Sequence, residues 1–413
     1  MTHTDVLIVG AGAAGLSAAR AAELAELSYV IVEAKGRLGG RAYTESESTG
    51  LPFDHGAHFL HAASRNPFRL YADQEGFNYL QGGYDNEVWD GRWLTSDERQ
   101  CFHSWAKKEL EYVALQAGAD NSHAASTLLS STHKFTNLFN GYYSEFLGAD
   151  PHQVAAGEHC RYEDTNEDWP LKMGYGALIA SYGAGIPIMF DCPVHEIDHT
   201  GRDIIVRTHK GNIRAQNVVV TASTGVLAAE VIRFTPGLDL SKLRAIEGIP
   251  MGYAGKIAFR IIDHAFAEID KHHGIVNLPN GVFANIHVKP FDQPIVVVIV
   301  GGPIWENIER AGPDAMSETA RDAIAVVYGA KAASSLLRPI TTNWLADPYT
   351  RGGHSYVRPG YGLTRQTLAQ PLDHRIHFAG EATSEESWAT VHGARFAAER
   401  AIKAIATRRS RGK

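Results

Sequence analysis

The chain has 413 residues, of which 44% are hydrophobic and 21% are charged, which is typical of a globular protein and excludes disordered and fibrous classes. The formal net charge is −7, from 39 basic and 46 acidic residues, so the chain lacks the basic footprint of a nucleic-acid-binding protein. Three scattered cysteines are too few for a disulfide framework or a zinc site, and we predict no metal. No apolar run could span a membrane and no signal pattern opens the chain, which predicts a cytoplasmic protein.

The first 33 residues predict one strand–helix–strand unit. Residues 5–9 form a short apolar run that is typical of a buried parallel strand. Residues 13–27 are rich in alanine and predict a helix, and residues 28–33 predict the next strand. A unit of this kind within about 30 residues is typical of an α/β domain with a parallel sheet.

Helical and strand patterns alternate in longer blocks along the rest of the chain. Residues 62–180 are mostly helical in pattern, and residues 186–220 predict several short strands. We expect further strands at 251–262, 281–288, 294–300 and 376–379, and helices at 105–117, 136–146, 317–333 and 392–407. The first, middle and last blocks therefore predict one α/β domain, with a second domain inserted between them.

The turn after the first strand carries the pattern G-x-G-x-x-G, formed by Gly10, Gly12 and Gly15 around Ala13 and Ala14. The first glycine makes the turn, the second lets the backbone approach a pyrophosphate, and the third lets helix and strand pack closely. The following helix offers free amides to the phosphates at its N-terminus. Glu33 ends the next strand, where it can accept hydrogen bonds from a ribose. In this setting the pattern predicts a dinucleotide-binding site.

A second glycine pair follows this acidic residue, in the sequence Arg37-Leu38-Gly39-Gly40-Arg41. The run resembles the R-x-G-G-R segment of the flavin-dependent amine oxidase family, where the segment grips FAD. The resemblance implies that Lys35, Gly40 and Arg41 contact FAD. The monoamine oxidases of this family attach flavin through a C-terminal cysteine. This chain has no cysteine after Cys192, which excludes that linkage and favours a non-covalent cofactor.

The resemblance recurs at intervals along almost the whole chain. Residues 54–61 resemble the D-x-G-A-x-W segment that passes beside the flavin ring, which implies contacts from Gly56, Ala57 and His58. Two further glycine-containing motifs of the family match at residues 174–176 and 221–227.

The remaining motifs lie at the second half of the cofactor site. Val194 stands where the family's valine holds the adenine through its backbone. Gly380 and Glu381 match the family's G-E piece near the ribityl and pyrophosphate groups, and Thr390 and Val391 begin its T-V-H-G-A piece. The resemblance places the last piece at a helix N-terminus facing the pyrimidine end of the flavin, where the helix dipole would stabilise reduced flavin.

Six matching segments in the family's order imply the family's architecture. The expected fold is α/β, with a discontinuous Rossmann-like FAD-binding domain and an inserted α+β substrate-binding domain. We place the FAD-binding domain at residues 1–62, 186–250 and 340–413, and the substrate-binding domain at residues 63–185 and 251–339.

Three residues outside the FAD motifs are implied to act on the substrate. Lys256 stands at the start of a strand where the family has a lysine that holds a water near flavin N5. Trp344 lies in W-x-x-D-P-Y, where it would form an aromatic wall of the substrate channel or, equally, a core tryptophan. His61 ends a run that resembles the G-A-x-W-x-H of polyamine and spermine oxidases, where this histidine could hydrogen-bond a substrate nitrogen. Thr390 leaves the two-ring cage of the monoamine oxidases incomplete.

The resemblance therefore implies an FAD-dependent amine oxidase that takes a small-molecule amine, favouring a polyamine, and dioxygen. A hydride would pass from the α-carbon of the amine to flavin N5, the imine would hydrolyse, and dioxygen would reoxidise the flavin to give hydrogen peroxide. The acidic residues at 163–164 and 167–168 could guide a cationic amine, but we expect them to lie in a solvated loop without such a role.

Several alternatives remain open from the sequence. A monoamine oxidase or an amino-acid oxidase of the same family is one, although we find no arginine placed to pair with a carboxylate. A flavoprotein desaturase or a redox sensor without amine turnover is another, since a fold and cofactor do not by themselves establish activity. A nicotinamide-linked dehydrogenase is disfavoured by the second glycine pair. The oligomeric state is left open.

Overall fold

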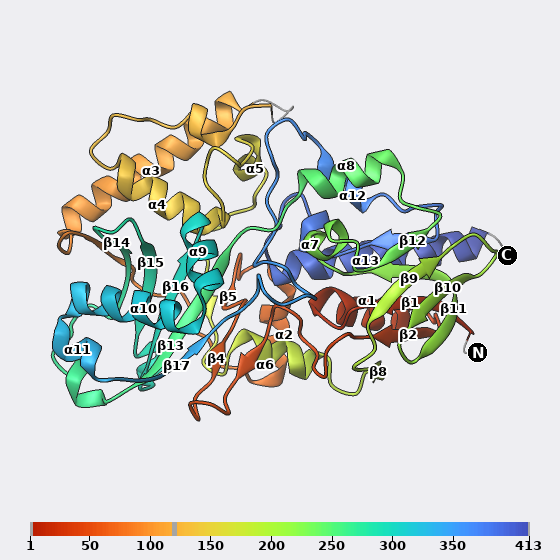
Figure 1. Cartoon of the computed structure of the whole chain (residues 1–413), viewed down its shortest axis with the longest axis horizontal. Helices are drawn as coiled ribbons and strands as arrows, with labels where there is room; N and C mark the ends of the chain where they lie inside the picture. The colour runs from red at the N-terminus through yellow and green to blue at the C-terminus, as the bar shows by residue number, and fades with distance from the viewer. Residues whose placement is uncertain (1–2, 118–121, 412–413) are drawn as a thin grey trace.

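A computed structural model describes residues 3–117 and 122–411, and two large β-sheets lie side by side in it (Figure 1). Within these ranges the first sheet has eight strands in the order β12-β9-β10-β11-β1-β2-β8, with β18 paired to β11. Its strands are β1 (His3–Val9), β2 (Tyr29–Val32), β8 (Ile188–Met189), β9 (Val194–Asp198), β10 (Ile204–Thr208), β11 (Gly211–Val220), β12 (Arg233–Thr235) and β18 (Ile376–Phe378). They come from the start, middle and end of the chain, and the predicted Rossmann-like α/β fold is confirmed.

The register of this sheet brings three strand ends together. Val9 of β1 lies opposite Val32 of β2 on one side and Val220 of β11 on the other, and both pairs are parallel. The carboxyl ends of these strands therefore meet at one edge of the sheet, which is where open α/β sheets bind their ligands. The residues that follow them, Gly10, Glu33 and Thr221, all line the same cavity.

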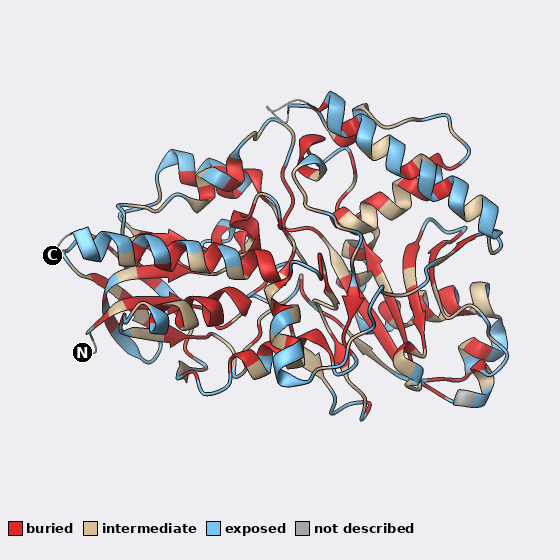
Figure 2. Ribbon diagram, turned by 180° about the vertical axis from the view of Figure 1, so that it is seen from behind, coloured by how far each residue is buried: buried red, intermediate tan, exposed pale blue. Residues whose placement is uncertain are grey.

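Two helices cover one side of this sheet. They are α1 (Ala13–Leu24) and α13 (Val391–Arg411), which lie against each other beside β1 (Figure 1). Their buried faces consist largely of alanine, so the helices pack closely on one another and on Val6 and Ile8. Figure 2 shows the strands buried and α13 exposed along its outer face. The N-termini of both helices point at the edge where the three strands end.

The second sheet has six strands among the described residues, in the order β17-β13-β16-β15-β14-β6. These are β6 (Glu87–Asp90), β13 (Ala254–Ile261), β14 (His273–Asn277), β15 (Phe283–Val288), β16 (Ile295–Gly301) and β17 (Leu336–Thr341). Three helices lie against one face of this sheet and its end, namely α9 (Pro303–Ala311), α10 (Pro313–Tyr328) and α11 (Ala330–Ser334). Helix α4 (Thr136–Leu147) packs on the other face, above β14, β15 and β16.

Alternation along the strands gives the two faces of this sheet different roles. Val276, Ala284 and Val298 point into the core under α10. Lys256, Ile299 and Asn285 lie opposite one another across β13, β16 and β15, and all three line the cavity on the α4 side. The second sheet therefore closes the cavity that the first sheet opens.

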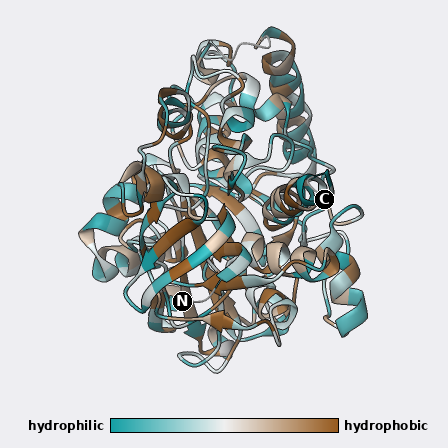
Figure 3. Ribbon diagram, turned by 90° about the vertical axis from the view of Figure 1, so that its right-hand side faces the viewer, coloured by the Kyte–Doolittle hydropathy of each residue, from teal (hydrophilic) through white to brown (hydrophobic). Residues whose placement is uncertain are grey.

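The remaining elements connect these layers. They are β3 (Thr44–Glu45), β4 (Phe53–Asp54), β5 (Phe59–Leu60), β7 (Trp169–Pro170), α2 (Pro67–Glu75), α3 (Ser96–Gln116), α5 (Gly157–Cys160), α6 (Tyr175–Tyr182), α7 (Thr224–Ala228), α8 (Leu240–Gly248) and α12 (Thr364–Ala369), with 3₁₀ turns at Ala125–Thr127, Asp263–Phe266, Pro290–Asp292 and Glu381–Thr383. Figure 3 shows apolar strands inside the molecule and polar outer surfaces on the surrounding helices.

Several predicted elements differ from the structure. The single helix expected at 317–333 is wrong, because Gly329 has a φ of +90° and separates α10 from α11. The helix expected at 105–117 begins earlier, at Ser96, because Thr95 and Glu98 form a capping box. Strands β6, β14 and β17 were not predicted.

The predicted domain division meets one observation that bears on its edges. Helices α2 and α6 fall in segment 63–185, which we assigned to the substrate-binding domain, yet Phe68 and Ile179 belong to the core cluster of α1 and β1. Within the described ranges, no helix combines the length and apolar character needed to cross a membrane.

Candidate active site

A cavity of about 1050 Å³ lies between the two sheets and reaches from the glycine turn after β1 to helices α3 and α4. Residues from both sheets and from the segments that join them line it. The two ends of the cavity have different linings. Backbone turns and one ion pair line the end at the first sheet, whereas acidic and aromatic side chains line the end under α4.

The glycine turn has the geometry that a dinucleotide needs. Gly10 has a φ of +101°, which favours glycine, and a Cβ on Gly15 would lie 1.9 Å from the carbonyl oxygen of Gly10. Gly12 caps α1 with no side-chain hydrogen bond to the helix, so its first amides are open to a ligand. Ala13 and Ala14 line the cavity there. The residues at this edge fit a bound pyrophosphate.

Glu33 is held at the end of β2. Its Oε2 accepts a hydrogen bond of 2.7 Å from the Ala11 amide, and its Oε1 accepts one of 2.9 Å from the Lys35 amide. The side chain of Lys35 forms an ion pair with Asp347. Burial, and then the charge of Arg37, lower the pKa of Lys35 to about 8. Both Glu33 and Lys35 line the cavity, as the dinucleotide interpretation requires.

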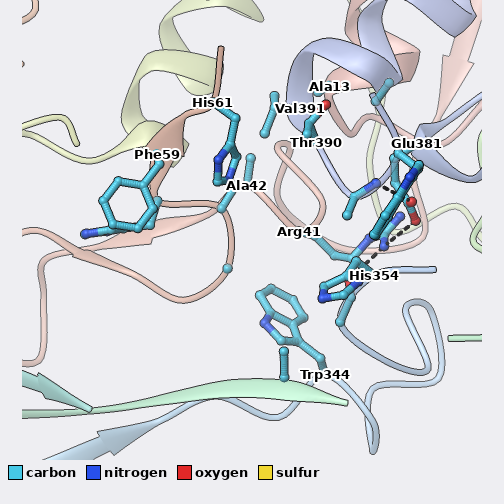
Figure 4. A pocket seen from close by; sticks show the side chains of 18 of the residues that line it. Ala13, Arg41, Ala42, Phe59, His61, Trp344, His354, Glu381, Thr390 and Val391 are labelled. Carbon is cyan, nitrogen blue, oxygen red and sulfur yellow. Dashed lines mark hydrogen bonds and ion pairs between the residues drawn. The ribbon is translucent and has the colours of Figure 1, made fainter. Parts of the chain in front are cut away.

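The ion pair at the first-sheet end of the cavity joins Arg41, which is partly exposed, to the buried Glu381 (Figure 4). Arg41 Nη1 donates to Glu381 Oε1 at 2.9 Å and to the carbonyl of Gly353 at 2.7 Å. Ser355 Oγ donates to the other carboxylate oxygen at 2.7 Å. Burial alone would raise the pKa of Glu381, but Arg41 and Arg365 lower it to about 2. Glu381 is therefore ionised throughout the physiological range.

Arg365 was not predicted as a site residue, and it extends this hydrogen-bond network away from the cavity. Its guanidinium is buried, forms an ion pair with Glu158, and donates to Ser355 Oγ at 2.8 Å. Glu158 and Arg365 are separated by 207 residues in the chain. No local sequence pattern distinguishes such a pair from exposed charges.

The second helix N-terminus lies beside the pair. Thr390 Oγ1 accepts from the Gly393 amide at 2.9 Å and donates to the Ser387 carbonyl at 2.7 Å. Val391 begins α13 and lines the cavity together with Thr390 (Figure 4). Val194, at the start of β9, lines the cavity wall next to β2 and β11. The predicted cofactor residues of the N- and C-terminal segments thus meet in one place.

Gly40 and Gly56 allow the chain to pass closely at two points. A Cβ on Gly40 would approach Cα of Gly12 to 3.2 Å, and Gly40 has a φ of +59°. A Cβ on Gly56 would lie 2.0 Å from the carbonyl oxygen of Arg41 and 3.1 Å from the ring of Trp344. Only glycine fits between these groups, and Gly56, Ala57 and the adjacent wall stay open to the cavity.

Lys256 is a buried amine on β13 that reaches the same point. Its Nζ donates to the carbonyl of Gly56 at 2.7 Å. Burial lowers the pKa of Lys256 to about 8, against the opposing effects of Asp54 and Glu145. The amine is therefore poised to lose its proton just above neutral pH, which an exposed lysine does not do.

Trp344 is 7% exposed and stands on the wall opposite His61 (Figure 4). Its Nε1 donates to the carbonyl of His55 at 3.1 Å, which fixes the ring beside Gly56. The ring is buried and also lines the cavity, which is compatible with either interpretation offered by the sequence.

His58 faces the cavity from the chain segment between Gly56 and His61. Its Nδ1 lies 3.5 Å from a carboxylate oxygen of Asp54, whose oxygens also accept from the amides at the start of α6. Burial and the charge of Lys256 lower the pKa of His58 more than Asp54 raises it. The ring is therefore neutral at pH 7.

His61 pairs with Asp168, one of the acids that the sequence places in a loop expected to be solvated. Its Nδ1 lies 2.6 Å from Asp168 Oδ1. Burial lowers the pKa of His61, but Asp168 and Asp164 outweigh it and raise the pKa overall. Asp164 and Asp168 are exposed, as expected of a solvated loop, and together with Glu163 they also line the cavity. Among the residues with described positions, no cluster of His, Cys, Asp or Glu could hold a metal ion.

Comparisons with known proteins agree with this geometry. Residues 109–406 match the family model described as flavin containing amine oxidoreductase, and residues 8–73 match an NAD(P)-binding Rossmann-like domain. The chain belongs to the flavin-containing amine oxidoreductase family. The resemblance inferred from the motifs is confirmed, and the cofactor of this amine oxidoreductase is FAD.

Relatives and solved structures span several substrates. The chain is 26% identical to the mouse lysine-specific histone demethylase 1B, over 98% of this chain and 53% of the demethylase, so it spans about half the length of that relative. It is 26% identical to probable polyamine oxidase 4 of Arabidopsis thaliana, over 94% of this chain and 84% of that protein. Cyclohexylamine oxidase from Brevibacterium oxydans has the same fold, with a TM-score of 0.83 at 23% identity and coverage of 98% and 99%.

Proposed function

We propose that this protein is an FAD-dependent amine oxidase that oxidises a small amine, with a polyamine as the favoured substrate and dioxygen as the acceptor. The observation that carries the proposal is the buried amine of Lys256, whose Nζ donates to the carbonyl of Gly56. This amine lines a cavity whose end under α4 carries acidic side chains. Bound FAD would supply the hydride acceptor for the amine's α-carbon, and the protein's residues would supply orientation, charge and exclusion of water.

The first-sheet end of the cavity is proposed to hold FAD without a covalent bond. The amides of Ala13 and Ala14 would bind the pyrophosphate, and Glu33 would bind a ribose after exchanging its own backbone hydrogen bonds. Arg41, neutralised by Glu381, would contact the cofactor without adding net positive charge. The remaining proposed cofactor contacts come from Gly12, Gly15, Lys35, Gly40, Ala57, His58, Val194, Gly380, Thr390 and Val391.

The other end is proposed to hold the amine. Lys256 would keep a water or proton at the reacting position, because an amine with a pKa of about 8 exchanges protons readily at neutral pH. Trp344 would form one wall of the channel. His61, whose pKa is raised by Asp168, would orient the substrate through a hydrogen bond, while the acids beside it attract the cation.

A proton must leave the substrate before it reacts. An alkylammonium has no lone pair on nitrogen, and the α-carbon gives up hydride only when the nitrogen can share its electrons. We therefore expect kcat/KM to rise with pH through the loss of one proton.

We propose the domain division with residues 1–62, 186–250 and 340–413 binding FAD and residues 63–185 and 251–339 binding substrate, apart from helices α2 and α6. The packing of α2 and α6 against α1 moves these two helices to the FAD-binding side.

The test is steady-state oxidation of a panel of amines by the purified yellow protein. Oxygen uptake and peroxide formation are followed with spermine, spermidine, N-acetylspermine, putrescine, cyclohexylamine, benzylamine and amino acids. We expect uptake with polyamines, one peroxide per oxygen, and less than a tenth of that rate with amino acids. A protein that retains FAD but consumes no oxygen with any amine contradicts the proposal, and uptake confined to benzylamine or cyclohexylamine contradicts its polyamine part.

A further inference from the structure

Helix α4 presents one face to the core and another to the cavity. Leu138, Phe139, Tyr143 and Leu147 are buried in the core cluster under this helix. Tyr142, Glu145 and Phe146 line the cavity. Residues three and four apart share a helix face, so the packing of the first set directs the second set inward. The position of Glu145 in the cavity is therefore fixed by the core of the domain and not by a flexible loop.

Among the cavity acids that are not exposed, Glu145 has no hydrogen-bond or ion-pair partner in the described part of the chain. Glu33 accepts backbone hydrogen bonds, Glu381 pairs with Arg41, and Asp168 pairs with His61. Among the described residues, none forms a hydrogen bond or an ion pair with the half-buried carboxyl of Glu145. A partly desolvated carboxyl without a counter-charge is costly unless a ligand supplies one.

The charge around Glu145 agrees with a missing cation. Burial raises the pKa of Glu145 to about 7. The charge of Lys256 on β13 opposes this rise but offsets only part of it. Burial, followed by the negative charges of Glu145, Asp164 and Asp168, raises the pKa of the Tyr142 hydroxyl. Tyr142 therefore stands among three acids, and an ammonium bound there would relieve all of these charges together.

Aromatic rings line the same cavity as this acid. The rings of Phe146 and Tyr162 are 5.7 Å apart, and the ring of Trp388 lies 5.0 Å from that of Tyr162. All three residues line the cavity. A cation near ring faces gains a further attraction in a partly desolvated site. The combination of one free carboxyl with aromatic walls is suited to an alkylammonium group.

We propose that Glu145 binds an ammonium group of the substrate other than the nitrogen that is oxidised, so that the cavity selects diamines and polyamines over monoamines. A carboxylate stabilises the charged form of an amine paired with it, and a charged nitrogen cannot assist hydride loss. The nitrogen on Glu145 is therefore the one that does not react. This inference rests on the proposed amine oxidase function and names the substrate class of the same cavity.

The kinetic test compares Glu145→Gln with Glu111→Gln. Glu111 on α3 also lines the cavity, but its side chain is exposed. The Glu111→Gln variant therefore removes the same charge from a solvent-exposed position of the cavity wall. With 1,5-diaminopentane we expect kcat/KM to fall about 30-fold in Glu145→Gln and less than threefold in Glu111→Gln. With pentylamine both variants should stay within threefold of the wild type. Equal losses for the diamine and the monoamine overturn the proposal.

A conservative variant guards against a merely structural effect. Glu145→Asp keeps the charge on a shorter side chain, and we expect it to retain at least a third of the wild-type preference for diamine over monoamine. Flavin content and the thermal midpoint of each variant report whether the fold is intact. A preference as low in Glu145→Asp as in Glu145→Gln contradicts a role for the charge.

A binding measurement supplies a readout apart from turnover. The ligands are 2,5-dimethylhexane-2,5-diamine and tert-butylamine, whose amine-bearing carbons have no hydrogen to lose. Calorimetry in two buffers of different ionisation heat counts the protons released on binding. With a pKa of about 7 for Glu145, binding of the diamine at pH 6.5 should release roughly 0.7 proton more in the wild type than in Glu145→Gln. The difference should vanish by about pH 8.5.

The outcomes separate the two proposals. A wild-type protein that neither oxidises nor binds any amine contradicts the proposed function, and the subsite with it. A wild-type protein that oxidises amines but shows no diamine preference, or no difference in proton release from Glu145→Gln, contradicts the subsite alone.

Discussion

Replacing Lys256 with methionine should stabilise the protein at neutral pH while it removes amine turnover. The amine of Lys256 is buried, and its pKa falls from 10.5 to about 8, chiefly because burial penalises the charged form. At pH 7 the folded protein therefore holds a charge in a place that disfavours it. Methionine has a similar length and no charge, so it fills the same space without that penalty.

The size of the effect follows from the shift in pKa. A fall from 10.5 to about 8 corresponds to about 3 kcal/mol of destabilisation at any pH well below 8. The hydrogen bond from Nζ to the Gly56 carbonyl offsets about 1 kcal/mol of it. The net gain for Lys256→Met is about 2 kcal/mol at pH 7, or about 2 °C in Tm for a chain of this length.

The sign of this gain changes with pH. Between pH 8 and 10.5 the unfolded chain keeps the proton of Lys256 while the folded protein has lost it, so wild-type stability rises with pH through this window. The advantage of Lys256→Met should therefore shrink above pH 8. By about pH 10.5 only the lost hydrogen bond remains, and the variant should be the less stable by about 1 kcal/mol.

The assay is thermal unfolding of the wild type and the variant in excess FAD, at intervals from pH 7 to pH 10.5. Lys107→Met, at an exposed position on α3 that also lines the cavity, is the control, and its Tm difference from the wild type should not depend on pH. A Lys256→Met protein that melts below the wild type at pH 7 would refute the reasoning. A difference in Tm that is the same at pH 7 and pH 10 would refute it equally.

Three further predictions concern the cofactor and the acidic end of the cavity. Gly15→Ala should be isolated without flavin, because its Cβ would lie 1.9 Å from a backbone carbonyl; absorbance of the purified protein checks this, and a full flavin complement contradicts it. Arg41→Met leaves the Glu381 carboxylate facing the cofactor without its nearest counter-charge, so FAD binding should weaken at least tenfold, measured by fluorescence titration. Asp168→Asn removes the larger of two charges that raise the pKa of His61; that pKa should fall, as followed by NMR titration of the ring, and an unchanged pKa would show that the pair is not formed.

The parts of the fold that local pattern determines could be predicted from the sequence. The strand, turn and helix around Gly10 to Gly15 are specified by an apolar run, a glycine turn and an alanine-rich segment, and the structure has β1 and α1 at those places. Strand β14 was missed because His272 and His273 interrupt any alternating pattern, and its strand conformation depends on pairing with β6 and β15. Its formation is a tertiary effect.

The candidate site divides in the same way. The proposed cofactor residues could be named because each lies in a short motif whose chemistry is local. The acid paired with His61 lies 107 residues away in the chain, and no spacing rule connects them. Glu145 could not be singled out either, since a single acid in a helix is usually exposed, and only the packing of α4 turns it inward.

The central claim is that amines reduce the FAD held in this cavity, and anaerobic titration of the purified protein with spermidine tests it most directly. The account predicts that the visible absorbance of oxidised flavin is lost in proportion to added amine, with an end point near one amine per flavin. Air should then restore the absorbance and yield one hydrogen peroxide per flavin. A flavin band that persists at tenfold excess of spermidine, putrescine and benzylamine alike would contradict the account.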